Sequence, residues 1–260
     1  MLVIFRSIVF NILFYLNLIV QLIGAIPTLV MPRVAILKVA TFWGRTNLWL
    51  LRVVCGIKIE CRGIEKIPHG PLLVASKHQS LWETFALLWA FSDPAYILKR
   101  ELLWIPFFGW YAWKARMISV DRGKRSQALA AMTEHARVAL AQGRQIVIFP
   151  EGTRRAPGAE PSYKFGIAHL YGETGASCLP VALNSGLFWP RRSFLRYPGT
   201  IVVEFLDPIA PGLDKVPFAA RLQSDIEDAT ARLLAEGERE LARNGIARRS
   251  TTAGLPSSRA

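Results

Sequence analysis

Residues 72 to 91 read LLVASKHQSLWETFALLWAF, and the two ends of this stretch follow different patterns. Leu72–Ser76 is a short apolar run of the kind that forms a strand. Ser80 and Glu83 fit S-x-x-E, the capping box that begins many helices. A strand that leads directly into a capped helix is typical of an α/β domain.

The same alternation continues along the chain. We expect further strands at Ile57–Cys61, Tyr96–Lys99, Met117–Val120, Gln145–Phe149, Leu179–Leu183 and Ile201–Phe205. We expect helices at Leu81–Phe91, Arg125–Ala141, Phe165–Tyr171 and about Pro217–Asn244. The predicted fold is therefore an N-terminal membrane-associated helical pair (residues 1–55), a single α/β domain with a largely parallel or mixed sheet (56–245) and a disordered tail (246–260).

The N-terminal stretch from Ser7 to Met31 contains no charged residue and is bounded by Arg6 and Arg33. Its length can cross the ~30 Å hydrocarbon core of a bilayer. A cleaved signal peptide is the alternative. Such a peptide has a shorter apolar region with a basic segment before it, and neither feature is found here.

The next stretch, Val34 to Val54, has the pattern of an amphipathic helix. Lys38, Arg45 and Arg52 are spaced by seven and fall on one stripe among large apolar residues. Such a helix can lie in the plane of the membrane interface. The two stretches form either a hairpin that dips into one leaflet or one span followed by an interfacial helix.

The charge balance indicates an anionic partner. Lysine and arginine number 32 against 19 acids, a net charge of +13. A nucleic-acid-binding protein would leave the long uncharged stretch unexplained, whereas eight tryptophans and fourteen phenylalanines favour a membrane surface. The three cysteines, Cys55, Cys61 and Cys178, are odd in number, and we expect them to be free thiols in a reducing compartment.

His78 and Glu83 are the first candidate for chemistry. Five positions correspond to about 500° of an ideal helix, so the two side chains would diverge if both were helical. The capping box removes this objection, because His78 then precedes the helix and only Glu83 belongs to it. Either Glu83 is a simple cap, or it folds back to fix the tautomer of a catalytic His78.

Two further motifs follow predicted strands. The segment IVIFPEGTRR (146–155) delivers Arg154 and Arg155 to a loop at a strand's carboxyl end, where ligands bind in open α/β sheets. Arginine there suits a phosphate group. In ILKRELLWIPFFGW (97–110), Lys99 follows another strand, and the aromatic residues after it form either a core-packing loop or an acyl-chain wall.

Other catalytic signatures are missing from the sequence. There is no G-x-S-x-G nucleophile elbow, no Walker motif, no GxGxxG after a strand and no metal-ligand spacing. We therefore expect no metal and no cofactor.

Together, these segments resemble the 1-acyl-sn-glycerol-3-phosphate acyltransferase family. KHQSLWETF resembles its His-x4-acid motif, KRELLWIPFFGW its second block, FPEGTRR its FPEGTRS-type third block and LPVAL (179–183) its fourth. The resemblance covers roughly residues 50 to 210. It implies a helical pair on the membrane and an α/β catalytic domain.

The resemblance implies a role for each matching residue. His78 is the general base for the sn-2 hydroxyl, and Glu83 is the orienting acid. Residues that grip the phosphate or position the glycerol are Lys99, Glu151, Gly152, Thr153 and Arg154. The implied partners are lysophosphatidic acid, acyl-CoA or acyl carrier protein as donor, and anionic lipids, with the catalytic domain on the cytoplasmic side of the cell's inner membrane.

Two positions depart from the family pattern. Glu83 stands where the family has aspartate, and Arg155 stands where it commonly has serine.

The acceptor can also be another lyso-lipid, such as lyso-ornithine lipid, which requires no phosphate-binding cations. A different class of function is a non-catalytic basic membrane-binding protein.

Overall fold

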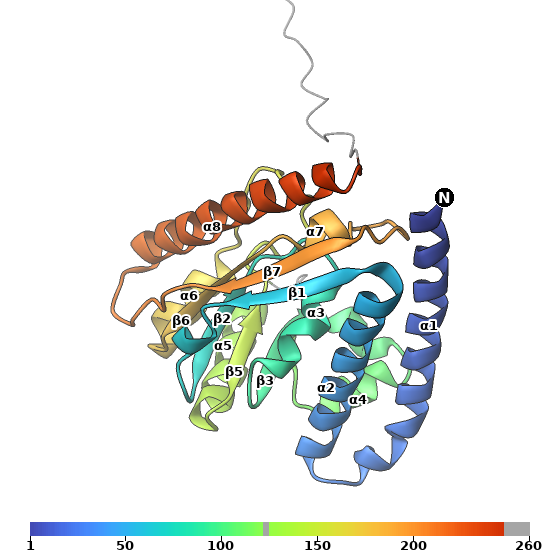
Figure 1. Cartoon of the computed structure of the whole chain (residues 1–260). Helices are drawn as coiled ribbons and strands as arrows, with labels where there is room; N and C mark the ends of the chain where they lie inside the picture. The colour runs from blue at the N-terminus through green and yellow to red at the C-terminus, as the bar shows by residue number, and fades with distance from the viewer. Residues whose placement is uncertain (122–124, 247–260) are drawn as a thin grey trace, which may run out of the picture.

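The computed structural model of the chain describes residues 1–121 and 125–246, with two long N-terminal helices standing beside an α/β domain (Figure 1). Most of the predicted 246–260 tail lies outside the described residues. Seven strands form one sheet in the order β1-β7-β6-β2-β5-β3-β4. The strands are β1 (Ile57–Arg62), β2 (Leu72–Ser76), β3 (Pro94–Lys99), β4 (Ile118–Val120), β5 (Gln145–Ile148), β6 (Cys178–Leu183) and β7 (Gly199–Phe205).

The sheet is mixed, as predicted. Strand β6 pairs with β7 in the antiparallel sense, and the other named neighbours pair in parallel. Strand β2 is buried on both faces. Leu72 and Val74 face one hydrophobic cluster while Leu73 and Ala75 face another, which is the period-two alternation of a strand.

Helices cover both faces of this sheet. They are α1 (Leu2–Gly24), α2 (Arg33–Leu50), α3 (Trp82–Ala86), α4 (Phe108–Lys114), α5 (Arg125–Ala141), α6 (Gly166–Thr174), α7 (Ser185–Phe188) and α8 (Lys215–Arg243). Helices α5, α6 and α8 contribute to the cluster on the Leu73 face. Helices α1 and α3 and the end of α2 contribute to the cluster on the Leu72 face.

Three local predictions differ from the structure. The helix expected at Leu81–Phe91 is a short α3 followed by a 3-10 turn, Leu87–Trp89. Helix α2 ends in a π-helical turn, Leu51–Cys55, which stops at Gly56 in the left-handed conformation with φ of 70°. The aromatic segment, for which the sequence allowed a core-packing loop or an acyl-chain wall, folds into a 3-10 turn, η5 (Arg100–Trp104), and α4.

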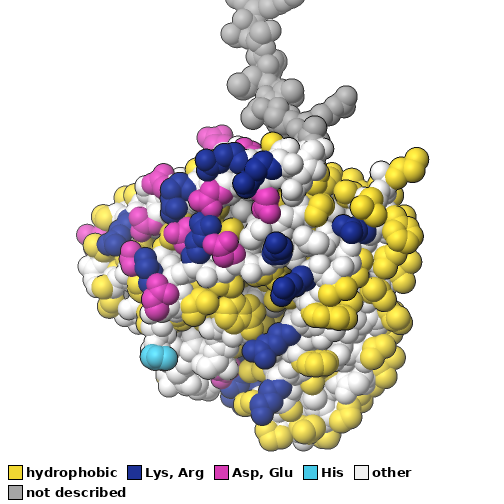
Figure 2. Space-filling view, viewed as in Figure 1, with side chains coloured by type: hydrophobic (Ala, Val, Ile, Leu, Met, Phe, Trp, Pro, Cys, Tyr) yellow, Lys and Arg dark blue, Asp and Glu magenta, His cyan; other side chains and the backbone are white. Residues whose placement is uncertain are grey.

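The N-terminal helices expose a wide apolar surface. Among the described residues, α1 is the one helix long and apolar enough to cross a membrane. Lys38, Arg45 and Arg52 are all exposed, as the predicted stripe requires. Figure 2 shows a line of basic side chains beside the apolar surface of this part of the molecule. The three cysteines are free, and Cys55 and Cys178 are buried.

Aromatic rings join α1 to the α/β domain. Phe10 and Phe14 are buried, and both meet Trp189 edge-on, with centroids 5.4 and 5.7 Å apart. Phe14 also lies 6.1 Å from the ring of Phe85 in α3. Aromatic pairs at such distances add to the free energy gained from burial alone.

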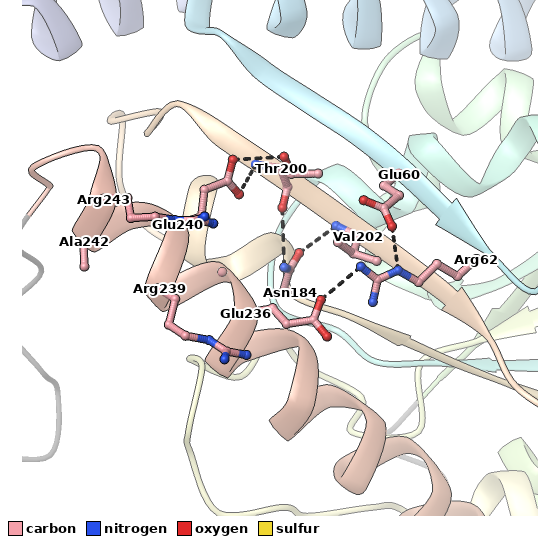
Figure 3. A pocket seen from close by; sticks show the side chains of 11 residues that line it. Glu60, Arg62, Asn184, Thr200, Val202, Glu236, Arg239, Glu240, Ala242 and Arg243 are labelled. Atoms are coloured by element: carbon pink, nitrogen blue, oxygen red, sulfur yellow. Dashed lines mark hydrogen bonds and ion pairs between the residues drawn. The ribbon is translucent and has the colours of Figure 1, made fainter.

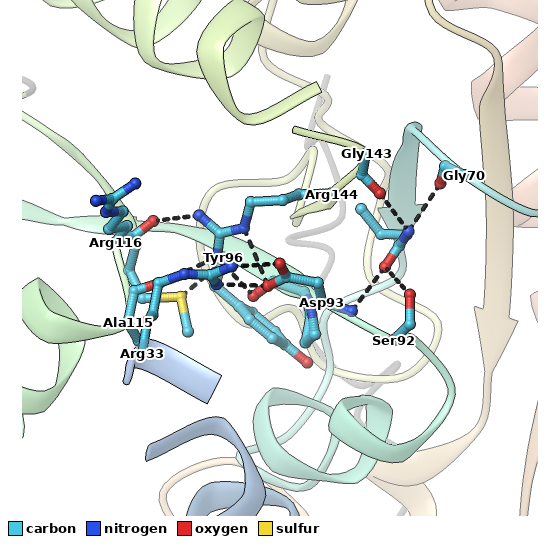
Figure 4. A network of polar contacts seen from close by, with 12 residues as sticks. Arg33, Gly70, Ser92, Asp93, Tyr96, Ala115, Arg116, Gly143 and Arg144 are labelled. Carbon is cyan, nitrogen blue, oxygen red and sulfur yellow. Dashed lines mark hydrogen bonds and ion pairs between the residues drawn. The ribbon is translucent and has the colours of Figure 1, made fainter. Parts of the chain in front are cut away.

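A polar network joins α2 to the amino ends of the central strands (Figure 4). Arg33, the first residue of α2, forms a two-pronged ion pair with Asp93 at 2.5 and 2.6 Å. The buried Arg144 donates to Asp93 at 3.1 Å and to the carbonyls of three other residues, Pro94, Ala115 and Arg116. Arg144 thus ties together the segments that enter β3, β4 and β5.

Arg144→Met is expected to destabilise the protein by about 3–5 kcal/mol, the usual cost of breaking a buried ionic network. The substitution leaves buried carbonyls without donors. The measurement is guanidinium denaturation of the detergent-solubilised protein, followed by circular dichroism. The control is Arg137→Met, which removes an exposed ion pair to Glu173 and should change the stability by no more than about 1 kcal/mol. Equal effects of the two substitutions would contradict the role of Arg144.

Candidate active site

The site lies where three parallel strands end. Strand β2 leads to Lys77 and His78, its neighbour β5 leads to the FPEGTRR loop, and β3, on the other side of β5, ends at Lys99. Because parallel strands present their carboxyl ends at the same edge, the predicted site residues gather at one edge of the sheet.

His78 and Glu83 form a direct pair, with His78 Nδ1 2.8 Å from Glu83 Oε1. The Glu83 side chain is fully buried, and His78 is 12% exposed. As predicted, the carboxylate folds back over the start of the helix, where Glu83 Oε1 accepts the backbone N–H of Ser80 at 2.7 Å and of Gln79 at 2.6 Å. Glu83 therefore holds the backbone that leads into α3 and pairs with His78 at once.

The second oxygen of Glu83 is also satisfied. Ser185, at the start of α7, donates its hydroxyl to Glu83 Oε2 at 2.8 Å, and this contact is buried. A carboxylate that receives N–H and O–H donors on both oxygens acts as an acceptor toward the imidazole as well, so His78 carries its proton on Nδ1. Nε2 is then the basic nitrogen, and no described residue hydrogen-bonds it.

An aromatic ring fixes the plane of this imidazole. The Phe149 ring stacks on His78 with centroids 4.1 Å apart and an angle of 19° between the planes. Phe149 follows β5 and begins the FPEGTRR motif. The FPEGTRR motif thus orients the His78 imidazole of the His-x4-acid motif.

Glu151 binds the backbone of His78. Its side chain is fully buried; Glu151 Oε2 accepts the backbone N–H of His78 at 3.0 Å, and Oε1 lies 2.7 Å from Lys77 Nζ. Burial raises the pKa of Glu151, while the Lys77 ammonium and the His78 N–H oppose this rise. The predicted contact of Glu151 with the glycerol stays a prediction, because the contacts seen are with Lys77 and the His78 backbone.

Lys77 is buried and joins three elements. Besides Glu151, its ammonium pairs with Glu227 of α8 at 2.6 Å. Glu227 also accepts a hydrogen bond from Tyr163 at 2.9 Å. Burial raises the pKa of the Tyr163 hydroxyl, which therefore stays protonated as a donor. The α8 helix and the loop before α6 are thereby attached to the residue next to the base.

The predicted phosphate-binding residues face solvent. Lys99, Thr153 and Arg154 are exposed, and Gly152 turns the loop with φ of 65°. The loop is attached to His78, because Arg155 donates its backbone N–H to the His78 carbonyl at 2.8 Å. These exposed cations can meet an anion at the edge where Nε2 lies.

Sequence reasoning missed Lys77, Ser185 and Arg191. Arg191 donates to the Arg154 carbonyl and brings another cation to the loop. Lys77 and Ser185 follow the carboxyl ends of β2 and β6, so their position after a buried strand was the available signal. What their side chains contact depends on segments distant in the chain.

A separate hollow of about 630 Å³ lies between α8 and strands β1 and β7 (Figure 3). Three of its carboxylates already have partners within the hollow. Arg62 bonds Glu60 at 2.6 Å and Glu236 at 3.0 Å, and Glu240 accepts two hydrogen bonds from Thr200. None of the predicted site residues lines it. The described residues bring no three His, Cys, Asp or Glu side chains together as metal ligands.

Comparisons with known proteins point to one family. Residues 58–184 match the family model named acyltransferase. The chain is 43% identical over 161 residues to a 1-acyl-sn-glycerol-3-phosphate acyltransferase of Pseudomonas aeruginosa, covering 62% of this chain and 63% of that protein. It is 33% identical over 172 residues to the 1-acyl-sn-glycerol-3-phosphate acyltransferase alpha of Mus musculus. That match covers 64% of this chain and 60% of the mouse protein. The chain thus covers less than two thirds of these relatives' length.

A solved structure shares the fold. The 1-acyl-sn-glycerophosphate (LPA) acyltransferase of Thermotoga maritima superposes with a TM-score of 0.73 at 23% identity. The match covers 88% of this chain and 96% of that one, and it extends the likeness beyond the family model.

Ser185→Ala is expected to lower kcat of a reaction in which His78 acts as a base by about 10- to 100-fold, the equivalent of a hydrogen bond to a charged group. The KM for the substrate should change little, because Ser185 contacts Glu83 and acts through it. The readout is a double-mutant cycle with Glu83→Gln. If Ser185 acts through the carboxylate, its loss should cost much less once Glu83 is neutral; fully additive losses would refute this role.

Proposed function

We propose that the chain is a 1-acyl-sn-glycerol-3-phosphate acyltransferase, which moves a fatty acyl group to the sn-2 hydroxyl of 1-acyl-sn-glycerol-3-phosphate and gives phosphatidic acid. The donor is acyl-CoA or acyl carrier protein, and no metal or cofactor takes part. The observation that carries the proposal is the His78–Glu83 pair, which leaves a basic Nε2 at the sheet edge beside the FPEGTRR loop.

The reaction requires one proton to move twice. His78 Nε2 takes the proton of the sn-2 hydroxyl as its oxygen attacks the thioester carbonyl. The tetrahedral intermediate collapses with cleavage of the C–S bond, and the imidazolium returns its proton to the leaving thiolate. The Glu83 carboxylate stabilises the imidazolium in between. No acyl-enzyme forms, and the products are the ester and a free thiol.

The substrate phosphate is assigned to the exposed cations at the same edge. Lys99 and Arg154 extend from adjacent parallel strands, β3 and β5, and their charges suit a phosphomonoester. Gly152 and Thr153 lie in the same loop and place the glycerol. These cations favour a phosphate-bearing acceptor over lyso-ornithine lipid, which offers no phosphate group to bind.

The membrane helices suit a lipid acceptor. We place α1 and α2 in the cell's inner membrane with the catalytic domain on the cytoplasmic side, where acyl-CoA and acyl carrier protein are found. The exposed apolar side chains of α1 and the basic stripe on α2 support contact with anionic lipids. A purely structural membrane protein would have no need of a buried carboxylate that fixes an imidazole tautomer.

The activity is tested with His78→Ala in reconstituted vesicles given lysophosphatidic acid and either donor. Loss of the base should lower kcat by about 10²–10⁴-fold. Glu83→Gln is the companion variant, because a cap tolerates an amide while a charge partner for the imidazolium does not. The assay follows radiolabelled phosphatidic acid. Wild-type rates for His78→Ala would remove His78 from the mechanism, and inactive wild-type protein with both donors would overturn the proposed acceptor.

Arg154→Ala should raise the KM for lysophosphatidic acid and leave kcat nearly unchanged, because the guanidinium binds a phosphate that does not react. The matched control is Arg239→Ala on α8, which removes the same charge from an exposed position. Initial rates over a range of acceptor concentrations separate the two constants. An equal rise in KM for both variants would indicate a general charge effect and contradict a specific phosphate contact.

A further inference from the structure

Three tryptophans of the segment after β3 are exposed. Trp104 of η5 is 75% exposed, and Trp110 and Trp113 of α4 are 53% and 74% exposed. The other side of α4 is buried through Tyr111 and Ala112. The proposed reaction uses none of these indoles, so their exposure calls for a different explanation.

The backbone holds this surface in place. Gly109 lies so close to η5 that a Cβ atom there would be 1.9 Å from the Leu103 carbonyl oxygen. Phe107, the residue before α4, has φ of 62°, a conformation that costs a non-glycine residue free energy. The Gly109 N–H also bonds the Ile105 carbonyl at 2.8 Å. These constraints fix α4 against η5, so the indoles belong to a defined surface.

This surface continues onto the N-terminal helices. The Tyr111 hydroxyl bonds the Leu22 carbonyl at the end of α1, and Tyr111 and Ala115 pack with Ile36 and Leu37 of α2. The turn between α1 and α2 and the helix ends beside it add more exposed apolar side chains: Ile23, Ile26, Val30, Met31 and Val34. The apolar surface thus extends from α1 across this turn to α4.

The chemistry of the surface matches a lipid interface. Indoles combine a large apolar ring with an N–H donor, and they concentrate where acyl chains meet headgroups. Exposed basic residues accompany the apolar surface, namely Lys38 and Arg45 on α2, Arg52 in the π-helical turn that follows it, and Arg116 two residues after α4. Basic side chains beside an apolar surface favour a leaflet with anionic headgroups.

We propose that η5 and α4 form a second membrane-contacting element, whose indoles Trp104, Trp110 and Trp113 lie in the interface of the leaflet that receives α1 and α2. The proposal rests on the proposed function of a membrane-associated lipid acyltransferase. Turn η5 begins at the residue after Lys99. Seating it in the interface therefore holds the catalytic edge of the sheet at headgroup depth, where the phosphate of a lyso-lipid lies.

The test uses proteins with one solvent-accessible cysteine, which is labelled with an environment-sensitive fluorophore. In a Cys61→Ser background, which leaves the two buried thiols, cysteine is introduced by Trp110→Cys or Trp113→Cys. Ile12→Cys on α1, 61% exposed, is the positive control. Val138→Cys on α5, 49% exposed, is the matched control on a helix outside this surface. Each full-length protein is reconstituted in phosphatidylcholine–phosphatidylglycerol vesicles with nitroxide-labelled lipids.

The labels at 110 and 113 should shift to shorter emission wavelengths and lose most of their emission to the nitroxides, as at 12, while the label at 138 should not. Labels at 110 and 113 that behave like 138 beside a quenched 12 would overturn this inference alone. An unquenched label at 12 would also overturn it, together with the proposed membrane contact of α1. Shifted labels that resist the nitroxides and depend on protein density would assign the surface to a second copy of the chain.

A second measurement guards against loss of folding in the cysteine variants. Trp110→Phe with Trp113→Phe keeps the apolar rings and removes two indoles. In vesicles with brominated lipids, this variant should lose part of the quenchable tryptophan emission of the wild type while its phosphatidic acid synthesis persists. An unchanged quenchable emission would contradict the proposal even where acyl transfer is normal.

Discussion

A single buried carboxylate, that of Glu83, organises the catalytic edge of the sheet. It receives the backbone N–H groups of Gln79 and Ser80, the imidazole of His78 and the hydroxyl of Ser185. A charge without partners in this interior would cost several kcal/mol. Its four donors therefore have to converge, and in converging they turn the chain after β2, begin α3 and set the imidazole.

The backbone of His78 is held from the opposite side by a second buried charge. Glu151 accepts the His78 N–H and pairs with Lys77, whose other partner is Glu227 of α8. The two carboxylates hold different parts of His78: Glu83 binds its imidazole ring, and Glu151 binds its backbone N–H. The FPEGTRR motif consequently has a buried half that holds the His78 backbone and an exposed half that contains Arg154.

The sequence predicted those parts of the fold that local patterns determine. The strands after Gly56 and the helix Arg125–Ala141 were found because their apolar periodicity is strong. The S-x-x-E pattern even placed His78 before the helix. It left open whether Glu83 caps or pairs. The structure shows the pair with His78, and the same oxygen also accepts the Ser80 N–H ahead of the helix.

Local sequence patterns did not predict the elements whose structure depends on contacts with distant parts of the chain. Helix α4 contains a glycine and follows Pro106, which both argue against a helix. It forms because Gly109 packs on the Leu103 carbonyl and Tyr111 reaches α1. Ser185 could not be assigned either, because its partner Glu83 is 102 positions away and belongs to another strand–helix unit.

Polar residues in the apolar N-terminus show how the helical pair relates to the site. Ser7 accepts the backbone N–H of Arg196, and Asn11 bonds both the Arg196 guanidinium and the Phe194 carbonyl. At the other end of the pair, Arg33 binds Asp93. The helical pair is therefore bonded to the α/β domain near both of its ends. A flexible tether would lack such contacts. The depth at which α1 and α2 lie in a lipid bilayer would therefore also set the depth of the sheet edge that carries His78.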